Sequence, residues 1–298
     1  MTLYNLIVTY NRSEDLRKTL SKLYKAKFDN IIVVDNASKD KTNLVIEHFI
    51  KLFNNFHLIT LSKNKGGSGG FAAGIKKFIE ISNPRDFILL QDDDSYPNFE
   101  SKIAKQYLLS DVVTFPVLDE DKTLHPMNIP GKNDFIKNPL ILIHKKYKRR
   151  PSTLNDFKNF SSFDYCSFVG LLIKRTVIES IGIPSENFFI YSDDTYYTST
   201  ISKKGIKILA SKPKHTFTHK SPRYSGTPLF KNKFVYYEIR NKLIYLREFS
   251  SYPFLFCSFW ILKCLLNLNH KNFFNVYNGI VHGLLHDRIK YHPSRPIS

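Results

Sequence analysis

The N-terminal part of the chain alternates apolar runs of strand length with segments of helical character, and this order constrains the fold more than any other feature. The strand-like runs are residues 3–9, 31–34, 57–61 and 86–91, and helices are expected from Ser13, a suitable N-cap, over 42–53 and over 70–81. Strands separated by helices are joined by right-handed crossovers in a parallel sheet. The sequence therefore predicts an α/β fold with a Rossmann-like, mostly parallel sheet flanked by helices.

The alternation ends near residue 117. Residues 118–160 are polar and contain a basic run at 144–150, so this stretch is expected to form an irregular insert. Further along the chain, regular structure is expected over 164–175, 176–181 (helix), 193–203 (helix), 206–210 (strand) and 216–219 (strand). From residue 229 to about residue 290 the chain has helical character. We therefore expect a helical extension behind the α/β core.

The positive charge is concentrated in this extension. The whole chain of 298 residues has a formal net charge of +18, yet residues 203–298 hold 17 Lys and Arg against 3 Asp and Glu. Such asymmetry favours a polyanionic partner, and composition leaves nucleic acid and an anionic membrane surface open. Hydrophobic residues make up 42% of the chain, which excludes a disordered protein.

Residues 253–266 are the most apolar stretch of the extension. The stretch is short for a membrane span and contains Lys263. An interfacial helix with its apolar face in lipid and a buried core helix both fit the pattern.

Polar or acidic residues follow all four predicted strands of the N-terminal part. Thr9, Tyr10 and Arg12 follow the first, Asp35 the second, Asn64 the third and Asp92 the fourth. In an open parallel sheet, ligands bind at the carboxyl ends of the strands. One such residue is ordinary turn chemistry, but together these residues predict one edge of a binding pocket.

A glycine cluster lies beside Asn64. Four of the 12 glycines in the chain fall within residues 66–70, followed by Phe71. The spacing is neither the dinucleotide-binding nor the P-loop pattern. A flexible turn is one interpretation, whereas close approach of backbone to a ligand at a helix start is the other.

Three adjacent carboxylates, Asp92, Asp93 and Asp94, end the fourth strand. They repel one another unless a cation lies among them, and oxygen ligands at a strand end suit Mg²⁺ or Mn²⁺. A second acidic pair, Asp193 and Asp194, opens a predicted helix, where it can cap the helix or supply a general base. His219 follows the last short strand and is a candidate metal ligand.

These motifs, in this order, resemble the family 2 inverting glycosyltransferases of the GT-A fold. The segments that carry the resemblance are 8–12, 34–38, 64–71, 91–94, 168–170, 182–184, 188–194, 219 and 237–241. The glycine stretch followed by Phe71 and the triple aspartate are most similar to the galactofuranosyltransferase and rhamnosyltransferase branch. The resemblance implies a catalytic domain over 1–228, with a nucleotide-sugar half at 1–117 and an acceptor half at 163–228, and a basic, aromatic tail over 229–298.

The resemblance also implies a role for each candidate residue. Thr9, Tyr10, Arg12 and Asp35 would bind the nucleotide, while Asn64, Gly69 and Gly70 would face the ribose-diphosphate and the donor sugar. Asp92 and Asp94, joined by His219, would hold Mn²⁺ or Mg²⁺, and Asp93 would contribute to the donor site. Asp194 would be the base that deprotonates the acceptor, assisted by Asp193. The chain departs from the family in lacking a tryptophan-rich acceptor motif, since its only tryptophan is Trp260.

The implied function is metal-dependent, inverting transfer of galactofuranose, rhamnose or galactose from a UDP- or dTDP-linked donor. The implied acceptor is a glycan, lipid-linked in surface polysaccharide synthesis. Two alternatives are a sugar-1-phosphate nucleotidyltransferase and a non-enzymatic protein that binds nucleic acid or anionic membrane. The acidic strand ends argue against a nucleic-acid partner. We therefore expect a cytoplasmic enzyme peripheral to the inner face of the cell membrane, with homo-oligomerisation left open.

Overall fold

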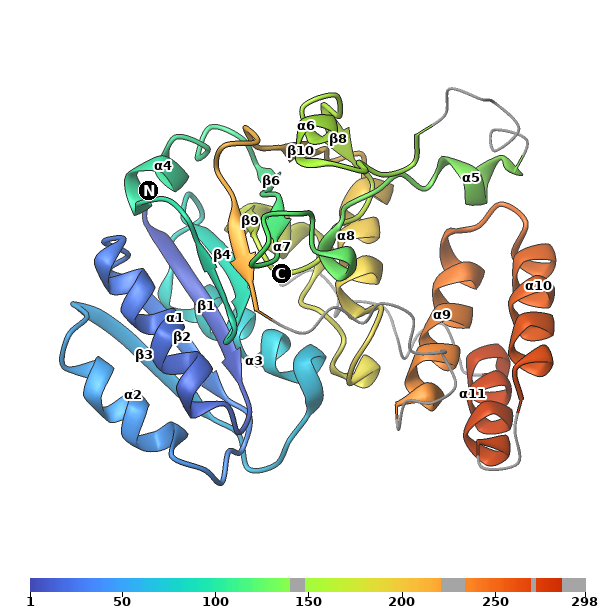
Figure 1. Ribbon diagram of the computed structural model, residues 1–298, viewed down its shortest axis with the longest axis horizontal. Coiled ribbons are helices and arrows are strands. Elements are labelled where there is room, and N and C mark those ends of the chain that lie inside the picture. Colours follow the sequence, from blue (N-terminus) through green and yellow to red (C-terminus); the bar gives the residue numbers. More distant parts are fainter. Residues whose placement is uncertain (140–147, 221–233, 269–271, 286–298) are drawn as a thin grey trace.

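The computed structural model describes residues 1–139, 148–220, 234–268 and 272–285. In these residues an eight-stranded sheet has the order β3-β2-β1-β4-β9-β6-β10-β8, and a three-stranded sheet has the order β5-β11-β7. Helices lie on both faces of the larger sheet, and three further helices lie together at one end of the molecule (Figure 1). The predicted α/β fold with a helical extension is confirmed.

The elements run along the chain as follows. The strands are β1 (Leu3–Thr9), β2 (Asn30–Asp35), β3 (Asn55–Thr60), β4 (Phe87–Asp92), β5 (Ser95–Pro97), β6 (Val112–Thr114), β7 (Val117–Leu118), β8 (Ser162–Phe163), β9 (Leu171–Lys174), β10 (Ile208–Ala210) and β11 (Phe217–His219). The helices are α1 (Ser13–Lys25), α2 (Thr42–Ile50), α3 (Gly66–Ile81), α4 (Ser101–Lys105), η1 (Pro126–Asn128), α5 (Asp134–Lys137), α6 (Leu154–Phe157), α7 (Arg175–Ile181), η3 (Glu186–Phe188), α8 (Asp193–Lys203), α9 (Val235–Phe249), α10 (Pro253–Leu266) and α11 (Phe273–Leu285).

Two hydrophobic layers enclose the large sheet because its central strands are apolar on both faces. One layer joins α1 and α2 to side chains such as Ile7 of β1 and Val33 of β2. The other joins α3, α7 and α8 to side chains such as Leu6 of β1 and Val34 of β2. Strands buried on both faces explain the continuous apolar runs in the sequence.

The register of the parallel strands aligns their polar ends. On β1, Thr9 pairs with Asp35 of β2, and Val8 pairs with Asp92 of β4. The strand ends that were expected to form one edge of a pocket therefore do lie along one edge. Strand β9 departs from the parallel pattern, because it runs antiparallel to both β4 and β6.

The small sheet brings the C-terminal candidate residue to the same edge. Strand β11 is antiparallel to β5, and His219 pairs with Ser95, the residue directly after Asp94. Predicted strand 216–219 is thus confirmed as β11, and its position results from pairing with the turn that follows β4.

Two details of the predicted elements are wrong. Ser13 is the first residue of α1, and Arg12 occupies the N-cap position without a side-chain cap. Helix α3 begins at Gly66, so the glycine cluster forms its first turn, in place of a loop before residue 70. The glycines allow close packing, since a Cβ on Gly70 would lie 2.3 Å from Val8 Cγ1 and one on Gly74 would lie 2.3 Å from Leu6 Cδ1.

The segment 118–160 was expected to be an irregular insert, yet its described part is packed into the protein. It contains η1, α5 and α6, and His125, Ile136 and Phe157 are completely buried. Isolated apolar residues in a polar stretch have no periodicity, so the sequence pattern could not reveal this packing. Part of the predicted basic run, residues 144–147, lies outside the described residues.

The helical extension packs against the α/β core through α9. Buried side chains of α9, such as Ile239 and Leu243, share one hydrophobic cluster with Ile136, Phe188 and Tyr196 of the core. Helix α11 lies against α9, where Gly283 leaves room for Leu243. Among the helices that the structure describes, none combines the length and the apolar character needed to cross a bilayer. The start of the predicted tail at residue 229 and its end beyond residue 285 lie outside the described residues.

We expect the close contact between α3 and β1 to tolerate no added methyl group. A Gly74→Ala change would push a Cβ against the fully buried Leu6, and overpacking of this kind destabilises by about 1–3 kcal/mol. The matched control is Gly67→Ala in the same helix, because nothing lies within 4 Å of the Cβ it would add. Urea unfolding measures both free energies of unfolding. A Gly74→Ala protein as stable as the control would contradict the packing.

Candidate active site

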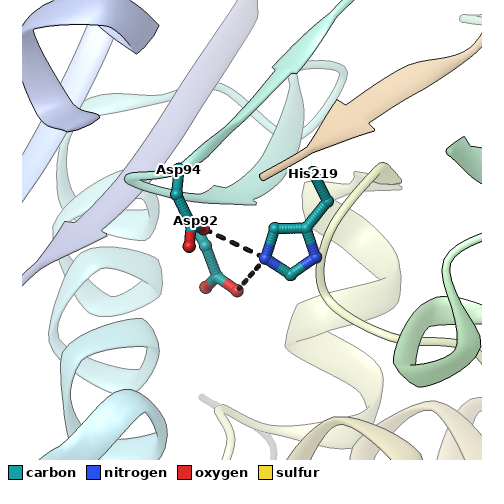
Figure 2. Close-up of side chains that lie close together, drawn as sticks. All are labelled: Asp92, Asp94 and His219. Carbon is teal, nitrogen blue, oxygen red and sulfur yellow. Dashed lines mark ion pairs between the residues drawn. The ribbon is translucent and has the colours of Figure 1, made fainter. Parts of the chain in front are cut away.

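A group of possible metal ligands lies at the carboxyl end of β4. One ligand atom from each of Asp92, Asp94 and His219 lies within 4.8 Å of the others. His219 Nε2 is 3.0 Å from Asp94 Oδ1 and 4.0 Å from Asp92 Oδ2, and Figure 2 shows the imidazole ring facing both carboxylates. Two carboxylate oxygens and one imidazole nitrogen are suitable ligands for Mn²⁺, and the oxygens also suit Mg²⁺.

A residue that was not predicted from the sequence orients the imidazole. His219 Nδ1 is 2.7 Å from Asn128 Oδ1, and the Asn128 amide nitrogen donates to Ser167 Oγ at 2.9 Å. Because the Asn128 amide oxygen is an acceptor, His219 Nδ1 carries the ring proton and donates a hydrogen bond to that oxygen. The other ring nitrogen, Nε2, faces the carboxylates. Ligating histidines generally have such an outer partner, so the observed arrangement fits a metal site. Asn128 belongs to the irregular segment, where no motif indicated it.

The middle aspartate points to different partners. Thr9 Oγ1 donates to Asp93 Oδ2 at 2.8 Å, and Arg12 Nη1 lies 3.4 Å from Asp93 Oδ1. The same Arg12 nitrogen lies 2.5 Å from Asp94 Oδ2, so the guanidinium bridges the two carboxylates. Asp93 therefore connects the ends of β1 and β4, whereas Asp92 and Asp94 face His219.

Burial and mutual repulsion shift the protonation of this cluster. Burial raises the pKa of Asp93 to about 7, although Arg12 acts in the opposite direction. Desolvation by burial and the neighbouring Asp94 raise the pKa of Asp92 to about 6, while His219 and Arg12 oppose the shift. Burial alone would lower the pKa of His219, but the hydrogen bond and charge of Asp94 raise it above its usual value.

The second acidic pair interacts electrostatically with the first cluster. Asp193 and Asp194 form the first turn of α8, and Asp194 Oδ1 accepts the Thr195 N–H at 2.6 Å. Burial raises the pKa of Asp194 to about 6, and the bonds from Thr195 limit the shift. Burial and the Asp194 charge hold the pKa of Asp193 well above its usual range, and Asp92 adds to this effect. The charge of Asp194 in turn acts on Asp92, so the two acidic clusters lie close enough to influence one another.

The other predicted residues lie along the same edge but differ in exposure. Tyr10 is 40% exposed, whereas Asp35 is buried and accepts the Ser38 N–H at 2.9 Å. Asn64 Oδ1 accepts the Gly66 N–H at 2.8 Å and so helps to start α3. Gly69 and Gly70 are buried in the first turns of α3.

A further residue that the sequence did not single out connects β2 to α3. The Asn36 amide nitrogen donates to the Gly66 carbonyl oxygen at 2.9 Å, and its amide oxygen accepts the Lys65 N–H at 2.9 Å. This position directly follows Asp35, so the polar end of β2 holds the start of α3 in place.

Comparison with solved structures shows the fold. Residues 1–349 of S. aureus TarS in complex with UDP-GlcNAc superpose with a TM-score of 0.59 at 17% identity, covering 95% of this chain and 80% of that one. The mannosyltransferase PcManGT from Pyrobaculum calidifontis, in complex with GDP-Man and Mn²⁺, gives a TM-score of 0.52 at 12% identity, covering 95% and 70%. The sheet and its acidic edge thus define a protein of the GT-A glycosyltransferase fold.

Comparison of the sequence identifies the family. Residues 6–182 match the model of glycosyl transferase family 2, and the chain belongs to this family. The low-salt glycan biosynthesis hexosyltransferase Agl10 of Haloferax volcanii is 23% identical over 203 residues, which cover 68% of this chain and 62% of that protein. The chain therefore aligns with less than two thirds of the length of this relative. The predicted resemblance to family 2 is confirmed.

We expect divalent cations to stabilise the protein more strongly as the pH rises. Protons compete for the metal ligands, because Asp92 ionises near pH 6 and the pKa of His219 is raised. In metal-free protein, the raised carboxylate pKa values also mean that stability is lost as these groups ionise, and a cation offsets that loss. The Mn²⁺-induced rise in Tm should therefore increase from about pH 5 to about pH 8. An Asp94→Asn variant should show a small rise at every pH, whereas a wild-type rise that is largest at pH 5 would contradict the site.

Proposed function

We propose that the protein is a metal-dependent, inverting hexosyltransferase that uses a nucleotide diphosphate sugar as donor. The observation that carries this proposal is a pair of acidic clusters whose charges act on one another: Asp92 and Asp94 with His219 at the end of β4, and Asp193 and Asp194 at the start of α8. The first cluster is suited to a cation on the donor diphosphate, and the second to a base for the acceptor. Family membership and the GT-A fold support the same reaction class.

The donor would lie along the carboxyl edge of the sheet. In this arrangement Thr9, Tyr10, Arg12 and Asp35 bind the nucleotide, and the backbone at the start of α3 near Asn64, Gly69 and Gly70 faces the ribose-diphosphate and the sugar. Arg12 is 47% exposed and bridges Asp93 and Asp94, so it can reach a phosphate without a change of backbone. Asp93 would act indirectly, because its carboxylate contacts Thr9 and Arg12 and would hold both side chains at the donor edge.

The transfer itself needs a base and a leaving group of low basicity. Asp92, Asp94 and His219 would hold Mn²⁺ or Mg²⁺, which neutralises the charge on the departing diphosphate. Asp194 would take the proton of the acceptor hydroxyl, the hydroxyl oxygen would bond to the anomeric carbon, and the bond from that carbon to the diphosphate oxygen would break. One displacement of this kind inverts the anomeric centre. A pKa of about 6 suits Asp194, because the carboxylate is ionised at neutral pH yet still accepts a proton.

The donor nucleotide, the sugar and the acceptor are inferred from the motifs of the sequence. We infer a UDP- or dTDP-linked donor carrying galactofuranose, rhamnose or galactose, and a glycan acceptor that is lipid-linked in surface polysaccharide synthesis. The name of the Haloferax volcanii relative, a hexosyltransferase of glycan biosynthesis, is consistent with a glycan acceptor. A nucleotidyltransferase or a purely nucleic-acid-binding protein would leave the family match and the Asp193–Asp194 pair without a role.

Substitutions in the two acidic clusters should affect different steps, nucleotide binding in one case and sugar transfer in the other. We expect Asp94→Asn to weaken Mn²⁺-dependent nucleotide binding, measured by calorimetry with UDP and dTDP. We expect Asp194→Asn to keep that binding but to lower kcat of sugar transfer by about 10²- to 10⁴-fold, since it removes a general base. Asp29→Asn, an exposed carboxylate on the connection before β2, is the matched control. Full transfer by both site variants would contradict the proposed function.

The same proposal includes attachment to an anionic membrane from the cytoplasmic side. Helices α10 and α11 lie at the end of the molecule remote from β3 (Figure 1), and both carry large exposed apolar side chains. This apolar tail surface consists of Phe254, Leu255, Phe259, Leu262, Leu265 and Leu266 of α10 and Phe273, Phe274, Tyr277, Leu284 and Leu285 of α11. Basic residues outnumber acidic ones by 17 to 3 in residues 203–298, which favours an anionic lipid surface over a second protein copy.

We expect the purified protein to bind phosphatidylglycerol-containing vesicles and to bind less at high salt, because surface charge attraction is screened. Replacing Phe254, Phe259 and Phe274 together by Ser should lower the partition coefficient at least about tenfold, since each ring loses its burial in lipid. The matched control is Leu109→Ser, which changes a side chain 93% exposed beside α4. Flotation measures binding, and light scattering measures mass. A dimer that the triple variant dissociates, with no vesicle binding, would contradict the lipid proposal.

A further inference from the structure

The backbone directly before the two catalytic candidates has an unusual conformation. Phe189, Tyr191 and Ser192 all have positive φ, at 63°, 67° and 61°, although none is glycine. At Phe189 the angles φ 63° and ψ −62° form a γ-turn, in which the Ile190 N–H donates to the Phe188 carbonyl at 2.8 Å. Such a turn is rare and strained, and it persists only where the surroundings hold it.

Two buried side chains of α9 hold this segment by its carbonyl groups. The Asn241 amide nitrogen lies 3.0 Å from Phe188 O, 2.9 Å from Ile190 O and 2.8 Å from Tyr191 O. These three carbonyl groups converge on one amide group, which is completely buried. The contact therefore fixes the direction of each peptide in the strained turn.

The neighbouring arginine extends the same contact. Arg240 Nη2 donates to Asn187 O at 2.7 Å and to Phe188 O at 3.2 Å, and Arg240 Nε donates to Asn241 Oδ1 at 2.9 Å. The last bond orients the amide so that its nitrogen faces the segment. Arg240 is 7% exposed and lies over the rings of Tyr236 and Tyr237, so its own position is also constrained.

The opposite side of the segment contacts the glycine-rich start of α3. A Cβ on Gly66 would lie 2.0 Å from the Phe189 carbonyl oxygen, and the Ser68 N–H donates to that oxygen at 3.3 Å. Ser68 Oγ donates to the Ser185 carbonyl at 2.5 Å. The segment is thus held between α3 and α9, and only glycine at position 66 leaves room for it.

We propose that Arg240 and Asn241 are positioning residues for Asp193 and Asp194. Helix α8 begins at Asp193, so the peptides at Tyr191 and Ser192 set the direction in which its first turn presents the two carboxylates. The adjacent carboxylates repel one another, and an unsupported turn would relax and move them apart. The proposal rests on the proposed function for the role of Asp194, but the contacts themselves can be tested without any substrate.

The test compares Asn241→Leu with Leu243→Ala in the same helix. Asn241→Leu keeps the approximate volume but removes the donor to three carbonyl groups. Leu243→Ala weakens the packing of α9 on α11 but removes no hydrogen bond to the strained segment. Hydrogen exchange of peptides covering 186–195 should increase in Asn241→Leu and stay near wild type in Leu243→Ala. If Asn241→Leu does not fold, Arg240→Lys provides the test. This change keeps the positive charge but loses the hydrogen bonds from the guanidinium to Asn187 O and Phe188 O.

Kinetics provide the second measurement. We expect Asn241→Leu to lower kcat about 10- to 100-fold, as misplacement of a catalytic group does, with donor KM and Mn²⁺ affinity near wild type. Leu243→Ala should keep kcat at temperatures below its Tm. The proposal is overturned if both variants lose activity only in proportion to their loss of Tm, or if exchange at 186–195 is unchanged in Asn241→Leu. A wild-type protein without transferase activity would refute the proposed function, while the exchange measurement would still test the contacts.

Discussion

Asp92, Asp93 and Asp94 lie at the end of β4, Asp193 and Asp194 open α8, and the repulsion among these carboxylates is the constraint on which the site depends. Different partners hold three of these carboxylates in place. Asp93 bonds to Thr9 and Arg12, Asp94 bridges Arg12 and His219, and Asp194 accepts hydrogen bonds from Thr195. These partners offset only part of the cost of placing carboxylates here: burial and the charge of Asp94 keep the pKa of Asp92 at about 6, and burial keeps the pKa of Asp194 at about 6. A divalent cation held by Asp92, Asp94 and His219 would neutralise part of this negative charge.

Three parts of the fold hold the acidic residues in place against this repulsion. The parallel register of β1 and β4 places Asp92 beside Val8, and the pairing of β11 with β5 places His219 beside the same turn. The third contribution is the strained turn before α8, which the backbone preferences of its own residues would not maintain. Its support comes from α3 on one side and from Arg240 and Asn241 of α9 on the other. The helical extension is therefore structurally part of the candidate site as well as the carrier of the apolar tail surface.

Much of this arrangement could be predicted from the sequence, and the reason is local patterning. Apolar runs that end in Thr9, Asp35 and Asp92 reveal both the strands and the edge at which they end. The range of α8, residues 193–203, follows from the acidic pair that opens it and is confirmed. Such signals are contiguous along the chain, so a single sequence contains them.

What could not be predicted depends on contacts between distant segments. Asn128 lies in a stretch without periodicity, and only the folded chain brings it to His219. The helix was expected to start only at residue 70, after most of the glycine cluster, whereas Gly66 and Gly70 are required where α3 meets Phe189 and Val8. Asn241 was recognised as part of a motif, but its three carbonyl partners are set by a turn that no propensity indicates.

The most direct test of the central claim is the anomalous scattering of Mn²⁺ in crystals grown with Mn²⁺ and UDP or dTDP. A metal held by this site gives one strong peak about 2–2.5 Å from the carboxylates of Asp92 and Asp94 and from His219 Nε2, in contact with the nucleotide diphosphate. A nucleotide bound elsewhere, or a Mn²⁺ peak remote from these three residues, would contradict the claim that this acidic edge is the donor site.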